Sequence, residues 1–387
     1  MHINQGLQVT SDSSSNPDHR PDPGAMDNAP PFDTFIATRN PSGLPGFEPQ
    51  PFTFSGRGSE YFRIWIVNLL LTLVTLGIYS AWAKVRRTRY LYDNTSVAGS
   101  SFDYHGNPIA ILKGRIIAIV LIALYHLGPR ISAWAGILVF VGAAAILPWL
   151  IWKSLQFKLH NSSYRGIRFG LRGSLGSAYK VFLLYPVLTA FSLYLLMPFA
   201  HQRIKRFQHN ASRFGNASFS FHATVGSFYK LYLTSWGLAI GGIIAMFILF
   251  NSTMFSAASH ASANGNIMRG TYITIFAIDL MLLVILPIYL SLLQNLVWNN
   301  TRLGEHRFES RMEWPRAVWI LLSNLFLIAV TLGLFVPFAT IRWQRFRIEA
   351  MVLLPASDLG EFAADSEASG SVTGEGVTDL MDFGLSL

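Results

Sequence analysis

The sequence predicts an all-α, multi-pass membrane protein: a pseudo-repeated helical bundle with short cytoplasmic β-strands or hairpins between its membrane segments. Composition is the first observation that predicts it. Of 387 residues, 51% are hydrophobic and only 13% are charged, and the mean hydropathy is +0.36. Soluble domains carry about 25% charged residues, so this chain is short of polar surface. The other two observations are long apolar segments and internal repeats.

Seven apolar segments are candidates for membrane helices, because about 20 residues cross the hydrocarbon core of a bilayer. They are residues 63–83, 110–128, 132–152, 179–200, 229–250, 272–293 and 317–340. Several are apolar on every face, as in ISAWAGILVFVGAAAILPWLIW. A helix of a soluble protein is rarely apolar all round over this length.

Charge divides the chain into three parts. Residues 1–51 are rich in Pro, Ser, Asp and Asn, and residues 352–387 are small and acidic, so we expect two disordered tails. The membrane domain between them, residues 52–351, holds 28 of the 30 basic residues and 8 of the 21 acidic residues. Because the basic residues flank apolar segments, the expected partner is the lipid bilayer with its anionic lipids, and no nucleic acid.

Three stretches repeat one design at offsets of 117 and 139 residues, without gaps. They are TLGIYSAWAKVRRTRY from Thr75, SLYLLMPFAHQRIKRF from Ser192 and TLGLFVPFATIRWQRF from Thr331. Each contains two arginines three residues apart, which share one face of a helix. The pairs are Arg86 and Arg89, Arg203 and Arg206, and Arg342 and Arg345.

A second repeated element lies between the apolar segments. It begins with a phenylalanine and alternates apolar and polar residues, which indicates a short strand with one buried face. Its five instances are FTFSG at Phe52, FDYHG at Phe102, FGLRG at Phe169, FSFHA at Phe219 and FESRM at Phe308. Turn residues, Asn followed by Gly, precede four of them. We expect short hairpins that pair into a small β layer; the alternative is five unrelated loops.

The stretch from FTFSG to FDYHG resembles the opening of the YjgN-type proteins, a family of bacterial inner-membrane proteins of unknown function. The shared pattern is FxFxG, TLGIY, Trp-Ala, an Arg cluster, Asn-Thr and FxYxG. The resemblance covers about residues 50–350 and is most specific at 52–106. It implies a multi-pass protein of the bacterial inner membrane, and it supplies no reaction, ligand or catalytic residue.

The basic residues also predict the orientation of the chain. Nearly all of them adjoin the links that carry the repeated strands, and the positive-inside rule makes that side, with the C-terminus, cytoplasmic. The first, fourth and seventh segments are basic at both ends, which seven simple crossings would not explain. We expect these three to enter and leave from the cytoplasmic side as broken helices, at TLG or near Pro186 and Pro198. The alternative is ordinary spans that violate the charge rule.

The arginine pairs are the first candidate site, together with Lys113 and Lys230, which lie a turn inside two apolar segments. Arginine binds phosphate or carboxylate in a forked geometry. These residues could therefore form a basic vestibule for an anionic solute or a lipid headgroup. The alternative is that they only anchor the protein to anionic lipids.

Three polar residues within apolar segments are further candidates. Asp279 lies deep in one segment, where a carboxylate serves as a proton relay, an ion ligand or a partner of Arg or a hydroxyl. Asn68 and Asn324 correspond in the repeat, and we expect them to hydrogen-bond between helices.

Motifs of catalysis or metal binding do not appear in the sequence. The chain has no cysteine, and its ten histidines lack metal-ligand spacing. We therefore expect no enzymatic activity, cofactor or metal. The predicted function is a transporter or channel-like protein for an anionic or amphipathic solute. The alternatives are a non-transporting scaffold or lipid-binding protein and, third, a membrane enzyme acting on lipids.

Overall fold

The computed structural model describes residues 48–258 and 263–359. They belong to one compact unit, which begins at Gly46. Nearly all of both predicted tails lies outside the described residues, so the prediction that they are disordered stays a prediction.

A sheet of eleven short antiparallel strands joins the elements of this unit. The strands are β1 (Gln50–Pro51), β2 (Thr53–Phe54), β3 (Thr95–Val97), β4 (Ser100–Tyr104), β5 (Ser162–Tyr164), β6 (Ile167–Leu171), β7 (Ser212–Phe214), β8 (Ala217–Phe221), β9 (Thr301–Leu303), β10 (His306–Ser310) and β11 (Met351–Leu354). Their order in the sheet is β1-β11-β10-β9-β8-β7-β6-β5-β4-β3-β2. Only Phe52 separates the two edge strands β1 and β2, so one extended segment forms both edges and the sheet nearly closes into a barrel.

The five phenylalanines of the repeated element lie next to one another around this sheet. Successive ring centroids, from Phe52 through Phe102, Phe169 and Phe219 to Phe308, are 6.3–6.4 Å apart. The contact of Phe308 with Phe52, at 6.5 Å, completes the circle. The predicted strands are therefore confirmed, and an apolar ring with pseudo-fivefold symmetry holds them together.

The Asn and Gly residues before each strand have distinct roles. Asn94 ends a helix, and its side-chain amide donates to the carbonyl of Tyr90 at 2.8 Å. Ala98 and Gly99 then form the turn between β3 and β4, with φ of +47° and +74°. Two successive residues with positive φ are typical of the type I′ turns that join hairpin strands.

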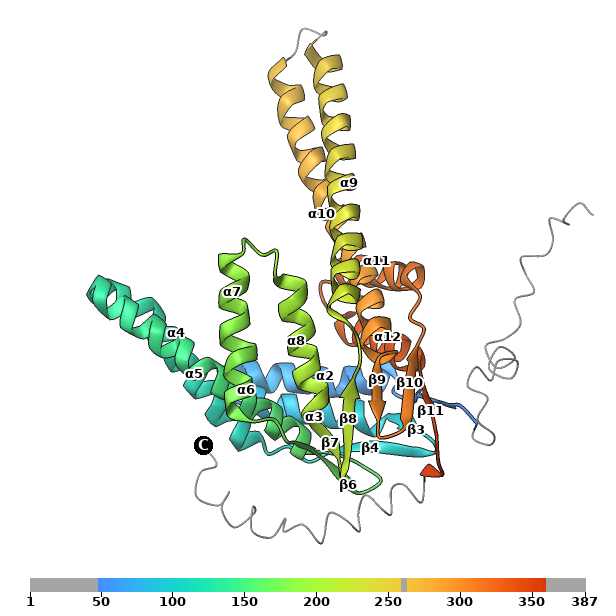
Figure 1. Ribbon diagram of the computed structural model, residues 1–387. Helices are drawn as coiled ribbons and strands as arrows, with labels where there is room; N and C mark the ends of the chain where they lie inside the picture. The colour runs from blue at the N-terminus through green and yellow to red at the C-terminus, as the bar shows by residue number, and fades with distance from the viewer. Residues whose placement is uncertain (1–47, 259–262, 360–387) are drawn as a thin grey trace, which may run out of the picture. The chain divides into compact units, whose positions relative to one another are not determined.

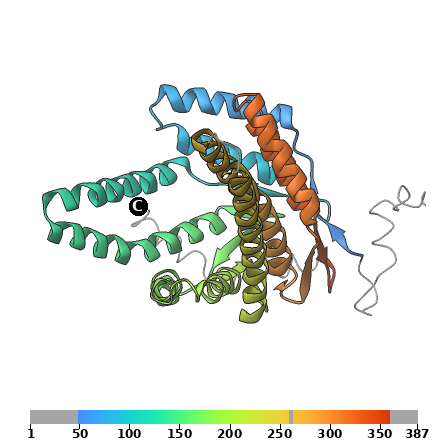
Figure 2. The same cartoon turned by 90° about the horizontal axis from the view of Figure 1, so that it is seen from above.

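Five helical hairpins connect the strands, and each begins and ends at the sheet (Figures 1 and 2). The first consists of α2 (Gly58–Val74) and α3 (Ser80–Asp93); the second of α4 (Pro108–Ile131) and α5 (Ala133–His160); the third of α6 (Leu175–Tyr179), the π-helix η1 (Lys180–Leu184), α7 (Tyr185–Phe191) and α8 (Met197–Asn210); the fourth of α9 (Val225–Ala258) and α10 (Ala263–Trp298); the fifth of α11 (Trp314–Val330) and α12 (Val336–Glu349). Successive hairpins pack on one another, and α12 packs on α2, so the hairpins also form a closed circle.

The first, third and fifth hairpins share one geometry. Each has a first arm of 17 residues and a second arm of 14 residues; α6, η1 and α7 together form the first arm of the third hairpin. Five-residue turns at 75–79, 192–196 and 331–335 separate the arms. The repeat at offsets of 117 and 139 residues is thus a repeat of whole hairpins, and the three segments expected to be broken are broken.

A hydroxyl group at the start of each of these turns fixes the second arm. The Oγ1 of Thr75 accepts a hydrogen bond from the backbone N–H of Tyr79, at 3.0 Å. The hydroxyls of Ser192 and Thr331 accept the equivalent bonds at 3.1 and 3.0 Å. Such a bond satisfies an N–H group that the start of a helix would otherwise leave without a partner.

The predicted fold class holds in part: the short strands expected between the helices are present, but they form one sheet of eleven strands, so the protein is mixed α and β rather than all-α. The strands have two to five residues each, so their pattern in the sequence is far weaker than that of the helices. The sheet also extends beyond the predicted membrane domain, residues 52–351, to Gln50 at one end and Leu354 at the other.

Three helices among the described residues are long and apolar enough to cross a membrane: α4, α5 and the part of α9 from Val225 to Ile248. Shorter apolar helices are Leu175–Phe191, Leu283–Trp298 and Trp314–Val330. Two of these shorter helices are the first arms of the third and fifth hairpins. The second, third and fifth predicted segments therefore meet the length and composition of a full span, turns divide the first, fourth and seventh, and the sixth lies partly outside the described residues.

Candidate functional site

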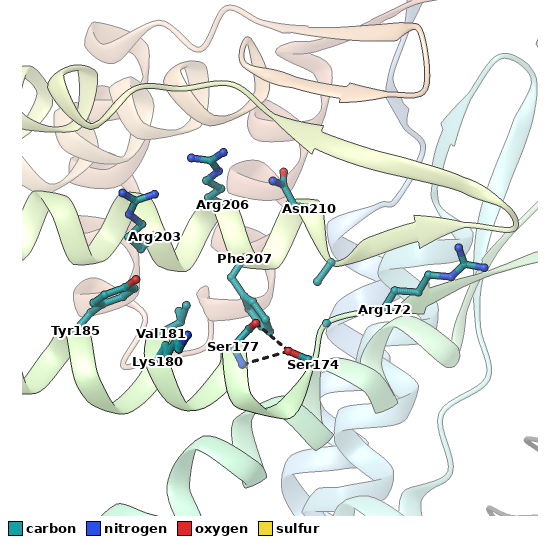
Figure 3. Close-up of a pocket in the computed structure, with 12 residues that line it drawn as sticks. Arg172, Ser174, Ser177, Lys180, Val181, Tyr185, Arg203, Arg206, Phe207 and Asn210 are labelled. Carbon is teal, nitrogen blue, oxygen red and sulfur yellow. Dashed lines mark hydrogen bonds between the residues drawn. The ribbon is translucent and has the colours of Figure 1, made fainter.

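A basic pocket of about 460 Å³ lies between the two arms of the third hairpin (Figure 3). Its lining is Arg172, Gly173, Ser174, Ser177, Lys180, Val181, Tyr185, Arg203, Arg206, Phe207, Asn210 and Ala211. Four of these residues are cationic, and none is acidic. The pocket thus contains the predicted pair Arg203 and Arg206, and it adds Arg172 and Lys180, which sequence reasoning missed.

Local sequence builds both walls of the pocket. On α8, Arg203, Arg206 and Asn210 follow one another at helical spacing and lie along one side of the helix (Figure 3). The opposite wall contains the π-helix η1, which starts at Lys180. Pro186 follows η1 and supplies no N–H to the helix, and π-helical turns occur frequently at functional sites.

The equivalent arginines of the other two short hairpins are tied to an asparagine. Arg342 donates to the Oδ1 of Asn324 at 2.7 Å, and to the hydroxyl of Ser323 at 3.2 Å. Arg86 donates to the Oδ1 of Asn68 at 3.5 Å. Both asparagines are buried, and each bond joins the two arms of one hairpin. The predicted interhelical hydrogen bonds of Asn68 and Asn324 are present.

The third hairpin lacks this partner. Tyr185 stands where Asn68 and Asn324 stand in the other two hairpins, at the same 117- and 139-residue offsets. The Nε of Arg203 is buried and has no hydrogen-bond partner among the described residues, and the guanidinium lies 4.9 Å from the ring centroid of Phe199. An unsatisfied buried donor on a charged group costs about 1–3 kcal/mol or more, which a bound acceptor would offset.

The second arginine of the pair shows the same contrast. In the fifth hairpin Arg345 forms an ion pair with Glu349 at 3.8 Å. In the first hairpin, the carboxylate near Arg89 is that of Asp93. Burial and the charge of Asp103 raise the pKa of Asp93, and the charge of Arg89 lowers it. The third hairpin has the neutral Asn210 at the position of these two carboxylates.

The side chains of Arg172, Lys180 and Arg206 form no hydrogen bond or ion pair with any residue that the structure describes. The pocket therefore gathers positive charge that no residue of the described ranges neutralises. Phosphate and carboxylate groups are the natural ligands of such a site, since arginine binds them through two parallel hydrogen bonds.

The structure keeps the other predicted site residues apart from this pocket. Of the three arginine pairs, Arg203 and Arg206 line the pocket, and the pairs of the first and fifth hairpins are not in its lining. Lys113 and Lys230 are exposed residues of α4 and α9, outside the pocket lining. Asp279 belongs to α10, but its side chain is outside the described residues.

Metal binding has no support in the described part of the chain. Among those residues, no three His, Asp or Glu side chains come together in a way that would hold a metal ion. The donor set of the pocket is cationic and hydroxylic, which suits an anion.

Comparison with known proteins places the chain in a family. Residues 49–380 match the family model described as "Bacterial protein of unknown function (DUF898)". The chain belongs to this family. It is 27% identical to the inner membrane protein YjgN of Salmonella typhimurium over an alignment of length 336, which covers 74% of this chain and 84% of that protein. The resemblance found from the sequence motifs is thereby confirmed.

Two further DUF898 relatives are proteins of the same name from Escherichia coli O157:H7 and K12. Each is 25% identical over 268 residues, which cover 68% of this chain and about half, 52%, of the relative. No solved structure matches the chain.

Proposed function

We propose that this DUF898 protein binds the phosphate group of an anionic phospholipid in the pocket of the third hairpin, as a lipid-binding membrane protein rather than an enzyme. One observation carries the proposal. The third hairpin has lost both the asparagine and the carboxylate that hold the equivalent arginines of the first and fifth hairpins, and its pocket contains four cations and no acid.

The depth of the pocket supports a lipid headgroup as the ligand. The turn of the third hairpin is strongly apolar, and Phe191 and Leu193 are 84% and 85% exposed, as lipid-facing residues would be. Nine residues of helix, or about 14 Å, separate Arg206 from the start of α8 at Met197. A turn that reaches the bilayer midplane, about 15 Å deep, would therefore place Arg206 at the level of the lipid phosphates.

The proposed location is the bacterial inner membrane, with the sheet and the C-terminus on the cytoplasmic side. Three relatives are named as inner membrane proteins. All five hairpins begin and end at the sheet, so the basic residues near their ends lie on one side if the second and fourth hairpins span the bilayer. The first, third and fifth would then enter the membrane without crossing it.

The test is the lipid that remains bound to the purified full-length protein. Native mass spectrometry would measure binding of phosphatidylglycerol and of the zwitterionic phosphatidylethanolamine, with inorganic phosphate as a competitor. We expect a preference for phosphatidylglycerol. Asn210→Asp should weaken it about tenfold, because a carboxylate next to Arg206 competes for the site and a charged hydrogen bond contributes about 1.5–3 kcal/mol.

Two variants make this test specific. Arg206→Gln should weaken binding as Asn210→Asp does, whereas Arg345→Gln removes the corresponding charge of the fifth hairpin and should leave binding unchanged. Equal loss in Arg206→Gln and Arg345→Gln would show general surface attraction and contradict the proposal. Displacement by millimolar inorganic phosphate would indicate that the ligand is a free phosphate rather than a lipid.

Transport of an anionic or amphipathic solute is a second proposed function. The closed circle of hairpins, in which α12 packs on α2, supports it, because such a circle surrounds one axis. Proteoliposomes would test it by uptake of an anionic solute, with Asp279→Asn as the comparison variant. Binding of lipid without any uptake above that of protein-free liposomes would leave lipid binding as the function.

A further inference from the structure

Strands β6 to β10 present a series of arginines on one face of the sheet. Along β6, Arg168 and Gly170 are two residues apart, so they lie on the same face. Arg213 on β7 pairs directly with Gly170 and, on its other side, with Ser218 of β8. Residues that pair directly in antiparallel strands share a face, so Arg168 and Arg213 lie on the same side of the sheet.

The same face continues across β9 and β10. Ser220 lies two residues beyond Ser218 on β8, and it pairs with Arg302 of β9. Arg302 in turn pairs with Arg307 of β10. Neighbouring strands are about 4.8 Å apart, so these residues belong to one continuous surface. We call it the arginine face, which consists of Arg168, Arg213, Arg302 and Arg307.

The arginine face is the outer face of the sheet. Arg168 and Arg307 each directly precede a phenylalanine of the apolar ring, and successive residues of a strand point to opposite faces. Three of the four arginines are exposed, and Arg213 is half-buried. The side chain of Arg213 lies close over Gly170, where any larger residue would meet it.

No carboxylate among the described residues neutralises this face. Arg168 hydrogen-bonds with the ring of His160 at 3.3 Å, which supplies no negative charge. The side chains of Arg213, Arg302 and Arg307 form no hydrogen bond or ion pair with any residue that the structure describes. Like charges directly opposite each other on two strands, as in the pair on β9 and β10, are destabilising. The face therefore favours an anionic partner.

The chain after β11 leads to the edge of the arginine face. The backbone N–H of Ala356 donates to the Nδ1 of His306 at 3.1 Å, beside β10. The carbonyl of Leu359 then accepts a hydrogen bond from Arg165 at 3.3 Å, and its side chain packs on a buried apolar cluster inside the sheet. Arg165 belongs to the turn between β5 and β6. Residue 360 therefore follows a residue that is held only three positions before Arg168 in β6.

We propose that residues 360–387 of this chain dock on the arginine face. They contain six acidic residues and no basic residue, so their charge complements that of the face. Three strand spacings, or about 15 Å, separate β6 from β9, and about five extended residues cover that distance. Docking neutralises the opposed arginines of β9 and β10 and covers the outer surface of the sheet. It is independent of lipid binding in the pocket of the third hairpin.

Cross-linking within the full-length protein tests this docking, since the chain has no native cysteine. Ser369→Cys places one thiol between acidic residues of the C-terminal segment. Ser218→Cys places the second on β8, at an exposed position between Arg213 and Arg302. In detergent without anionic lipid, a short bismaleimide should join these two thiols within one chain. Peptide mapping by mass spectrometry would measure the rate.

A matched pair controls for simple proximity. Ser101→Cys is also an exposed serine on the outer face, and Ser100 beside it bonds the same Arg165 that holds Leu359. The tethered segment therefore starts near Ser101, yet we expect Ser369→Cys to react with Ser218→Cys about fivefold faster, because exposed ion pairs hold it there.

Neutralising either partner should remove this preference. Arg302→Gln with Arg307→Gln, or Asp365→Asn with Glu367→Gln, should lower the rate for Ser218→Cys to that for Ser101→Cys, and so should molar salt. Equal rates for the two serine positions, or a preference that survives these substitutions, would overturn the proposal. Cross-links that join two chains would also overturn it, and would assign the arginine face to a second copy of the protein.

Discussion

His209 connects α8 to the fourth hairpin as a neutral group. Burial, and then the charge of Lys205, lowers the pKa of His209 from 6.5 to about 4. Between these values the unfolded chain binds more protons than the folded protein. The contribution of His209 to stability is therefore complete above about pH 6.5 and is lost as the pH falls towards 4.

A pH series would measure this contribution. We expect the thermal unfolding midpoint to fall between pH 7 and pH 4.5, and His209→Phe to reduce that fall. The pKa shift of His209 corresponds to at most about 3–4 kcal/mol, since one pKa unit is about 1.4 kcal/mol. Phe retains the ring contacts with Phe221 and Trp298 and cannot be protonated. An unchanged pH slope in His209→Phe would assign the acid sensitivity to other groups.

Single residues of the site were only partly predictable from the sequence. Repeat alignment singled out Arg203 and Arg206, because both arginines recur at fixed offsets. Arg172 and Lys180 do not belong to the aligned stretch, and the fold brings them to the pocket through the preceding strand and η1. The sequence nonetheless contained a signal that the third hairpin differs. The same alignment places Tyr185 at the position that Asn68 and Asn324 occupy in the other two short hairpins.

At the scale of elements, the five-residue turn of the short hairpins requires unusual backbone angles. In the fifth hairpin, φ is +50° at Leu332 and +92° at Gly333. In the third, Leu193 and Tyr194 adopt +51° and +65°. Glycine tolerates such angles, whereas a side chain in the left-handed region costs about 1–2 kcal/mol. The third hairpin thus contains a strain that the fifth avoids.

Exchanging these residues tests that strain. Gly333→Ala should lower the unfolding midpoint by several degrees, although no atom lies within 4 Å of the new Cβ, because the backbone angle alone is unfavourable. Tyr194→Gly should raise the midpoint slightly, since Tyr194 is 65% exposed and loses little packing. Differential scanning fluorimetry would measure both, and a Gly333→Ala protein as stable as wild type would contradict the argument.

The breaks in the first and seventh segments were predictable from TLG, which places a glycine where φ is positive. The break in the fourth segment was not predictable by that rule, because Tyr194 replaces the glycine. Pro186 and Pro198 indicated a break in the right region, yet Pro186 follows the π-helix and Pro198 is the second residue of α8. The turn itself lies between them, at residues 192–196.

At the scale of the whole molecule, the sequence indicated a threefold repeat, and the structure has five related hairpins. The three short hairpins have equal arm lengths, so fixed offsets align them. The second and fourth hairpins have longer arms of different lengths, which no single offset matches to the others. Only the phenylalanine strands recur in all five, because the sheet needs one apolar residue at the same place in each unit.

Accessibility labelling would test how the whole molecule sits in the membrane. The chain has no native cysteine, so each single-cysteine variant gives one signal. In right-side-out vesicles, we expect a membrane-impermeant maleimide to label Ala133→Cys, at the start of α5, because the second hairpin crosses the bilayer. Asn216→Cys, an exposed position next to β8, should react only after the vesicles are opened.

The short hairpins should show a different result, because they enter the membrane without crossing it. Leu193→Cys and Leu332→Cys, at the turns of the third and fifth hairpins, should react with a lipid-soluble maleimide and not with the impermeant one. Labelling of Leu193→Cys from outside intact vesicles would mean that the third hairpin reaches the periplasm, and it would contradict the one-sided arrangement from which the depth of the basic pocket was derived.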